Sequence, residues 1–358
     1  MYVLLLCLGY FVSYTVYGIA IKYFIQVEHM PGMELLYHST IGGIFTAMLI
    51  AVIGRWPQRL KSTSSQRLWG LFPAEYAWLI PSGLCTAFVI PTTSLMYTFG
   101  FNIMVAMIIM RSSLIVISRG VDAVLIYQGH SDKKVYWQEN VAALIAIAAL
   151  STVLMEGGKP GTFDFFHSTL FMANLGCYII PYGFRLYILS RFKTKIDSRA
   201  IFGIEQVWAF SACIVGILLT ILAFTQFGFA PKQVEEFAYG FFNPNFKAMA
   251  WSIPYGLVAV FSVFLFIYKF GSATFNTIVN RLTSLLAGTA ASVASFYYLG
   301  GKPVAAHEWK ALGVVLLAIT FLVWADRRRH AEKKRTVTSS NPAFSSGAAM
   351  PVGATLRQ

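Results

Sequence analysis

Long apolar runs recur along the whole chain and constrain its fold more than any other feature. A run of about 18 apolar residues or more is long enough to cross a bilayer as a helix. Charged residues make up only 12% of the chain, roughly half the share of a soluble domain. The sequence therefore predicts an all-α polytopic membrane protein with about ten transmembrane helices. These are expected near residues 2–23, 32–54, 77–99, 102–127, 138–155, 166–189, 201–225, 248–269, 273–299 and 309–325.

The basic residues collect in every second loop of this arrangement. With a cytoplasmic N-terminus, one side of the membrane holds Arg55, Arg59, Lys61, Arg67, Lys133, Lys134, Arg191, Lys193, Lys195, Arg199 and 327–329. This distribution follows the positive-inside rule, so we expect both termini to be cytoplasmic, in a plasma or inner membrane rather than an organelle membrane. The rule also accounts for the net charge of +13 without a nucleic-acid partner. The lipid bilayer and a small-molecule substrate are the expected partners, and the sequence leaves open whether the protein forms a homodimer.

Two segments share residues at a nearly constant spacing. The stretch WLIPSGLCTAF at 78–88 matches WSIPYGLVAVF at 251–261, and five further matches, 171 positions apart, continue through the next helix. Shared membrane composition explains matched leucines and glycines, but it poorly explains the paired Trp, Pro and Tyr. A unit of five helices has an odd number of spans, so the two copies would be inverted in the membrane, as in many secondary transporters. We expect five-helix repeats at 1–156 and 157–329, and a disordered cytoplasmic tail at 330–358.

The fourth helix of each half carries the clearest motif. The two helices read VAMIIMRSSLIVISRGVDAVLIYQG and FNTIVNRLTSLLAGTAASVASFYYLGG, and each is a small and apolar run that ends near a glycine. With ten helices in two halves, this pattern resembles the drug/metabolite transporter superfamily, whose members include EamA-like and nucleotide-sugar-transporter-like carriers. Many members carry Gly-Glu after the run, whereas Gly129-His130 and Gly300-Gly301 lack the acid. The resemblance covers about residues 1–326 and implies a small-molecule carrier without a cofactor.

Charged side chains interrupt the apolar run at 102–127. A charge at bilayer depth is costly, which makes it a functional-site hypothesis. At about 100° per residue, Arg111, Ser118 and Asp122 fall on one narrow stripe that should face the protein interior. Arg119 lies at the edge of this stripe and can pair with Asp122 as a purely structural element. Arg111 is deeper and has no obvious partner in its own helix, so we expect it to contact the substrate.

Arg281 occupies nearly the equivalent place in the second half. Its stripe is rich in hydroxyl groups and includes Thr277 and Ser292. Close helix packing explains the small residues of this stripe, but it does not explain the arginine. Because guanidinium groups bind carboxylate or phosphate through two hydrogen bonds, Arg111 and Arg281 predict an anionic or polar substrate.

Tyrosines and titratable residues supply further candidates. Tyr14 and Tyr178 lie on the first helix of each half, where they could contact a substrate or belong to an interfacial aromatic belt. A coupling proton would need a titratable group, and the candidates are Glu34, His38 and Glu205. Each of them could instead be a polar residue at a helix end. Exchange of one solute for another would need none of them.

The sequence contains no common catalytic motif, such as HExxH, GxSxG or a P-loop. The four cysteines show no metal-binding spacing, so neither an enzyme nor a metal site is expected. We therefore expect a secondary transporter of a small organic solute that works by alternating access. The alternative is a non-transporting membrane scaffold that keeps the carrier fold. A polar cavity shared by the two halves would favour transport, and dry contacts between them would favour the scaffold.

Overall fold

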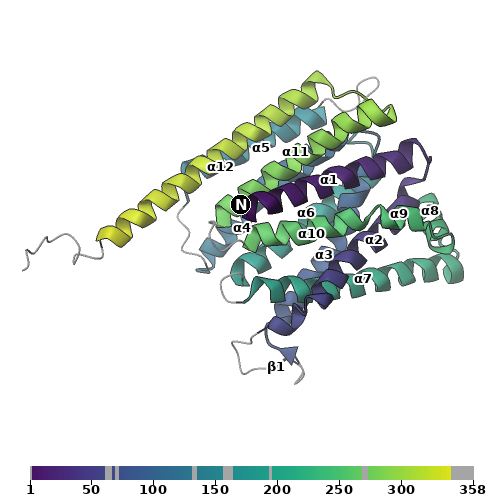
Figure 1. The fold of residues 1–358 in the computed structure, drawn as a ribbon, viewed down its shortest axis with the longest axis horizontal. Helices are drawn as coiled ribbons and strands as arrows, with labels where there is room; N and C mark the ends of the chain where they lie inside the picture. Colours follow the sequence, from purple (N-terminus) through teal and green to yellow (C-terminus); the bar gives the residue numbers. More distant parts are fainter. Residues whose placement is uncertain are drawn as a thin grey trace, which may run out of the picture.

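The computed structural model describes residues 2–60, 67–68, 72–130, 135–155, 164–192, 196–267 and 273–339, which form a bundle of long helices (Figure 1). Each of the ten predicted spans is helical. The long helices are α1 (Tyr2–Gln26), α2 (Gly32–Ile53), α3 (Tyr76–Thr98), α4 (Ile103–Tyr127), α5 (Trp137–Met155), α6 (Thr169–Phe192), α7 (Ser198–Phe227), α10 (Ile253–Ile267), α11 (Ala273–Leu299) and α12 (Ala306–Ser339).

Among the described residues, nine helical segments are long and apolar enough to cross a membrane. The chain is thus an all-α, multi-pass membrane protein, as predicted. Of the ten long helices, α6 alone contributes no such segment. It nevertheless runs the length of the bundle. Phe171 near its start lies 5.6 Å from the ring of Phe99 after α3, and Tyr187 near its end donates to Gln128 after α4.

The bundle has two ends, which we call end A and end B. End A holds the connections between α1 and α2, α3 and α4, and α11 and α12. There, Lys22 donates to the carbonyl oxygens of Phe99 and Phe101, at 3.1 and 2.8 Å, and Asn102 donates to the Glu308 carboxylate at 2.8 Å. These contacts tie the three connections together at one end of the bundle.

End B holds the connections between α2 and α3, α4 and α5, and α6 and α7. The Arg191 guanidinium lies 4.6 Å from the Trp78 ring centroid there, and Arg329 pairs with Glu139 at 2.5 Å. The start of α1 also lies at end B, because α1 reaches end A at its last turn. Neighbouring long helices in the chain therefore alternate in direction.

The helices of the two halves pack against one another in a matched way. In the first half, α3 packs on α6 and α7, which are the first two helices of the second half. In the second half, α10 packs on α1 and α2. The remaining long helices pair as α4 with α11 and α5 with α12, and α5 and α12 lie side by side along one edge in Figure 1. Helix α4 is central, and every residue from Ile103 to Ile115 is buried.

Short elements that the sequence did not predict connect the long helices. At end A, α8 (Lys232–Phe242) and α9 (Phe246–Ala250) lie between α7 and α10. Gly228 ends α7 in the left-handed conformation, at φ 62°, which favours glycine. At end B, a 3₁₀ turn (Pro57–Arg59) precedes the two-residue strands β1 (Arg67–Leu68) and β2 (Phe72–Pro73), which pair antiparallel.

The predicted disordered tail does not begin at residue 330, because helix α12 continues to Ser339. Past the apolar part of the helix, Arg328 pairs with Glu332 at 3.3 Å, and Tyr136 donates to Glu332 at 2.8 Å. An ion pair between residues four positions apart stabilises the part of a helix that continues beyond its apolar segment. The rest of the predicted tail, 340–358, lies outside the described residues.

Candidate functional site

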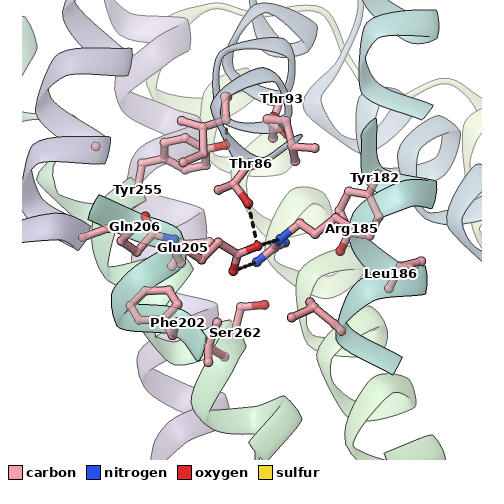
Figure 2. A pocket seen from close by; sticks show the side chains of 18 of the residues that line it. Thr86, Thr93, Tyr182, Arg185, Leu186, Phe202, Glu205, Gln206, Tyr255 and Ser262 are labelled. Atoms are coloured by element: carbon pink, nitrogen blue, oxygen red, sulfur yellow. Dashed lines mark hydrogen bonds and ion pairs between the residues drawn. The ribbon is translucent and has the colours of Figure 1, made fainter. Parts of the chain in front are cut away.

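A cavity of about 230 Å³ lies between the two halves. Its lining includes Tyr14, Thr93 and Arg111, which lie inside first-half helices, and Leu189 and Phe202, which lie toward end B (Figure 2 shows this region). The remaining lining residues are Tyr10, Gly43, Ala47, Thr86, Val89, Ile90, Tyr178, Tyr182, Arg185, Leu186, Ser190, Ile201, Glu205, Gln206, Tyr255, Val258, Ala259, Ser262 and Val263. The cavity therefore extends from the middle of the bundle toward end B.

Packed aromatic rings lie beside this cavity. The ring of Tyr17 stacks on that of Tyr255 at 4.4 Å between centroids. The Tyr17 hydroxyl donates to Ser94 at 2.6 Å, and the Tyr255 hydroxyl donates to the Ile90 carbonyl at 3.0 Å. These bonds join α1, α3 and α10 beside the cavity, where Ile90 and Tyr255 belong to its lining.

Arg111 reaches this cavity from the centre of α4, and only 7% of the residue is exposed. Its Nη2 donates to the Tyr10 hydroxyl at 3.3 Å, and its Cζ lies 5.9 Å from the Tyr14 ring centroid, within cation–π range. Its Nε is buried without a hydrogen-bond partner in the described structure. No carboxylate of the described residues lies within 4.0 Å of its nitrogens. A buried guanidinium is thus left without a counterion.

Tyrosines from both halves surround this guanidinium. Tyr10 and Tyr14 come from α1, one helical turn apart, with ring centroids 5.4 Å from each other. Tyr178 and Tyr182 come from α6 with the same spacing, at 5.5 Å. All four interact electrostatically with Arg111. A spacing of four residues places both members of each pair on one helix face, so each half contributes one tyrosine pair to the site.

A second arginine in the cavity does have a counterion. Arg185 of α6 donates through Nε to Glu205 Oε1 at 2.5 Å and through Nη2 to Oε2 at 2.9 Å. Ser82 and Thr86 of α3 donate to the same Oε1 at 2.7 and 2.8 Å. Figure 2 shows Arg185, Glu205 and Thr86 meeting between their helices. The Glu205 side chain is 1% exposed and that of Arg185 is 15% exposed, so this is a buried and well-bonded ion pair.

Sequence reasoning singled out Glu205 but missed Arg185. The signal was available, because Arg185 is a lone charge within the apolar stretch IIPYGFRLYIL, and the argument used for Arg111 applies equally to it. Tyr14 and Tyr178, both candidates from the sequence, do line the cavity.

Several other candidates lie elsewhere. Arg281 is buried between α11 and α4, where its Nη2 donates to the Leu114 carbonyl at 3.3 Å and to Ser118 Oγ at 3.1 Å. Neither Arg281 nor Ser118 is among the residues that line the cavity. Asp122, one turn beyond Ser118, is half-buried and does not line it either. The described structure therefore brings one of the two predicted arginines to the cavity.

The remaining candidates lie near end A or outside the described part of the structure. Ser292 accepts a hydrogen bond from the Met104 backbone N–H at 2.7 Å and lines a separate pocket at end A. Glu34 and His38 lie 3.8 Å apart on α2, outside the lining of the main cavity, and His38 is fully buried. The side chain of Thr277 lies outside the described part of the structure.

The groups that line the cavity can bind a polar or charged ligand. In the described ranges, no group of three or more His, Cys, Asp or Glu residues could hold a metal ion. The cavity instead offers a guanidinium, tyrosine hydroxyls and rings, and the hydroxyl groups of Thr93 and Ser262. No protein-family model matches this chain, and a comparison with curated proteins finds no match.

Proposed function

We propose that the protein is a secondary transporter of a small organic anion and that Arg111 binds the anionic group. One observation carries the proposal. Arg111 is buried in a cavity between the two halves, one of its nitrogens has no hydrogen-bond partner, and no carboxylate of the described chain lies within 4.0 Å of it. A carboxylate or phosphate on the substrate would supply both the missing counterion and the missing acceptor.

The energetic argument rests on the cost of burying a charge. Taking a guanidinium out of water costs several kcal/mol even after the protein relaxes, and a cation–π contact with Tyr14 offsets about 0.5–2 kcal/mol. A scaffold protein would gain nothing from keeping such a cation beside an open cavity. A carrier would gain substrate affinity, because an anion that binds Arg111 recovers this cost in the bound state.

Alternating access through an inverted repeat is part of the proposal. The matched packing of α3 and α10 on the opposite halves supports it. A further sequence match supports it as well, since GMELLY at 32–37 aligns with GIEQVW at 203–208, again 171 positions later. In the state described here the cavity extends toward end B. In the opposite state, the Tyr17–Tyr255 layer would separate and the end B helices would close.

The basic residues at end B, including Arg55, Arg191 and Arg329, support a cytoplasmic location for that end and for both termini. The state described here would then be the one whose cavity extends toward the cytoplasm, in a plasma or inner membrane.

Uptake into proteoliposomes tests the function. A panel of radiolabelled small carboxylates and organic phosphates is offered to the parent protein and to Arg111→Ala, at matched protein amounts. We expect Arg111→Ala to abolish uptake of any transported anion, and Arg111→Lys to rescue it poorly because an ammonium lacks the two-pronged geometry. Arg119→Ala is the matched control, since Arg119 lies on the same helix and donates to Asn140 at 2.7 Å, outside the cavity lining.

Two results would contradict the proposal. Arg111→Ala transporting like the parent would make the arginine structural. A folded parent protein that neither transports nor binds any member of the panel would favour the scaffold alternative.

A further inference from the structure

The described cavity is lined by three charged side chains, Arg111, Arg185 and Glu205. Arg185 and Glu205 neutralise each other through two hydrogen bonds, so the lining keeps one uncompensated positive charge, at Arg111. Arg281 does not line the cavity, and its Nη2 donates instead to the Leu114 carbonyl and to Ser118 Oγ. The charge that a ligand meets in the cavity is therefore set by whether Glu205 stays paired with Arg185.

Both arginines line this cavity. Tyr178, Tyr182 and Arg185 follow one another on a single face of α6, at spacings of four and three residues. The Tyr182 ring centroid lies 6.0 Å from Arg185 Cζ, and Tyr182 lines the same cavity as Arg111. A ligand with two anionic groups could thus face both arginines, but Glu205 already occupies the second one.

We propose that Glu205 determines substrate charge, acting as a built-in anion that occupies Arg185 and restricts the cavity to organic molecules with a single negative charge. This inference rests on the proposed anion site at Arg111 and adds the charge class of its substrate. The geometry around Glu205 resembles that of a bound ligand, because two arginine nitrogens and two hydroxyl groups donate to one carboxylate. The second anionic group of a dianion would have to displace this carboxylate or lie close to it unpaired.

Glu205→Gln is the informative substitution. The amide keeps an oxygen that can accept from Ser82 and Thr86. It removes the charge and replaces the oxygen that accepts from Arg185 Nη2 by an NH₂ donor, so Arg185 loses its counterion and is left for the ligand. Binding is measured on the detergent-solubilised full chain as the rise in unfolding midpoint with ligand concentration. The probes are two matched pairs at pH 7.5, succinate with succinamate and glutarate with glutaramate, and the members of each pair differ by one charge.

We expect the parent protein to bind the monoanion of each pair more tightly. In Glu205→Gln, the ratio of the two affinities should move toward the dianion by about tenfold or more, the change that about 1.4 kcal/mol produces. In the double variant Arg185→Gln with Glu205→Gln, the ratio should return to the parental one, because Arg111 is again the only charge in the lining. A purely structural role for the pair predicts no such return.

Arg185→Gln alone gives an independent test if Glu205→Gln does not fold. It leaves Glu205 as an unpaired negative charge, so the affinity for both members of a pair should fall about tenfold or more, and adding Glu205→Gln should restore it. An affinity ratio in Glu205→Gln within twofold of the parent, or a double variant that stays unlike the parent, overturns the inference. Failure of the proposed function looks different, since Arg111→Gln would then bind all four probes like the parent, or the parent would bind none.

Discussion

Two glycines at corresponding positions of the similar segments 78–88 and 251–261 provide a quantitative test of the packing between helices. Gly256 of α10 faces α2, and a Cβ built on it would lie 2.5 Å from both the Gly43 carbonyl oxygen and Thr46 Cβ. Gly83 of α3 faces α7, where a Cβ would lie 2.6 Å from Trp208 Cβ. Ordinary contacts begin at 3.4 Å, so each pair of helices would have to separate by nearly 1 Å.

Gly256→Ala and Gly83→Ala should therefore each destabilise the protein by about 1–3 kcal/mol, the usual cost of overpacking a well-packed interface. Gly216→Ala on α7 and Gly313→Ala on α12 are the matched controls, because a Cβ at either position meets no atom within 4 Å. The controls should be neutral or more stable by up to about 1 kcal/mol, the helix-propensity difference between the two residues.

The assay is the thermal unfolding midpoint of the full chain in detergent, read beside the monodisperse fraction after purification. The two interface variants should melt below the parent and the two controls at or above it. If Gly256→Ala melts like Gly313→Ala, the helices do not approach as closely as described, and the matched packing that supports the inverted repeat loses one of its two contacts.

Two further predictions concern end B. Arg329→Ala removes a cation that pairs at 2.5 Å with Glu139, whose side chain is 4% exposed, so it should lower the free energy of unfolding by about 3–5 kcal/mol. The double variant Glu139→Gln with Arg329→Gln should lose less stability, and an equal loss would contradict the ion-pair explanation. Truncation after Ser339 should leave the unfolding midpoint unchanged. Truncation after Arg329 removes the Glu332 contact with Tyr136 and should lower the midpoint. Equal midpoints for the two truncations would show that the last turns of α12 contribute nothing to stability.

The transmembrane helices could be predicted because the signal for them is local. A run long enough to cross the bilayer is visible in one dimension, and each of the ten expected runs is helical in the described structure. The end of α12 was predicted less well, because the residues that extend it are charged and their pairing partners include Tyr136, far away in the chain. Helix α8 was not predicted because it is short and half-polar. It packs on α2 and α7 rather than crossing the bundle.

The site was predictable only in part. The sequence shows that Arg111, Arg185 and Arg281 each lie within an apolar run, and the cost of burying a charge makes each of them worth explaining. Sequence spacing cannot show which of them has a partner, since that depends on how neighbouring helices are rotated and how closely they approach.

The sequence by itself determined the membrane class, the helix positions and the place of the charges within the apolar runs, because hydrophobic length acts along the chain. The tertiary structure alone decided the roles of the arginines. It turns Arg281 toward Ser118 of α4, joins Arg185 to Glu205 of α7, and leaves Arg111 among tyrosines from both halves. The physical reason is that ion pairing requires contact within a few ångströms, and such contacts between different helices exist only once the bundle has packed.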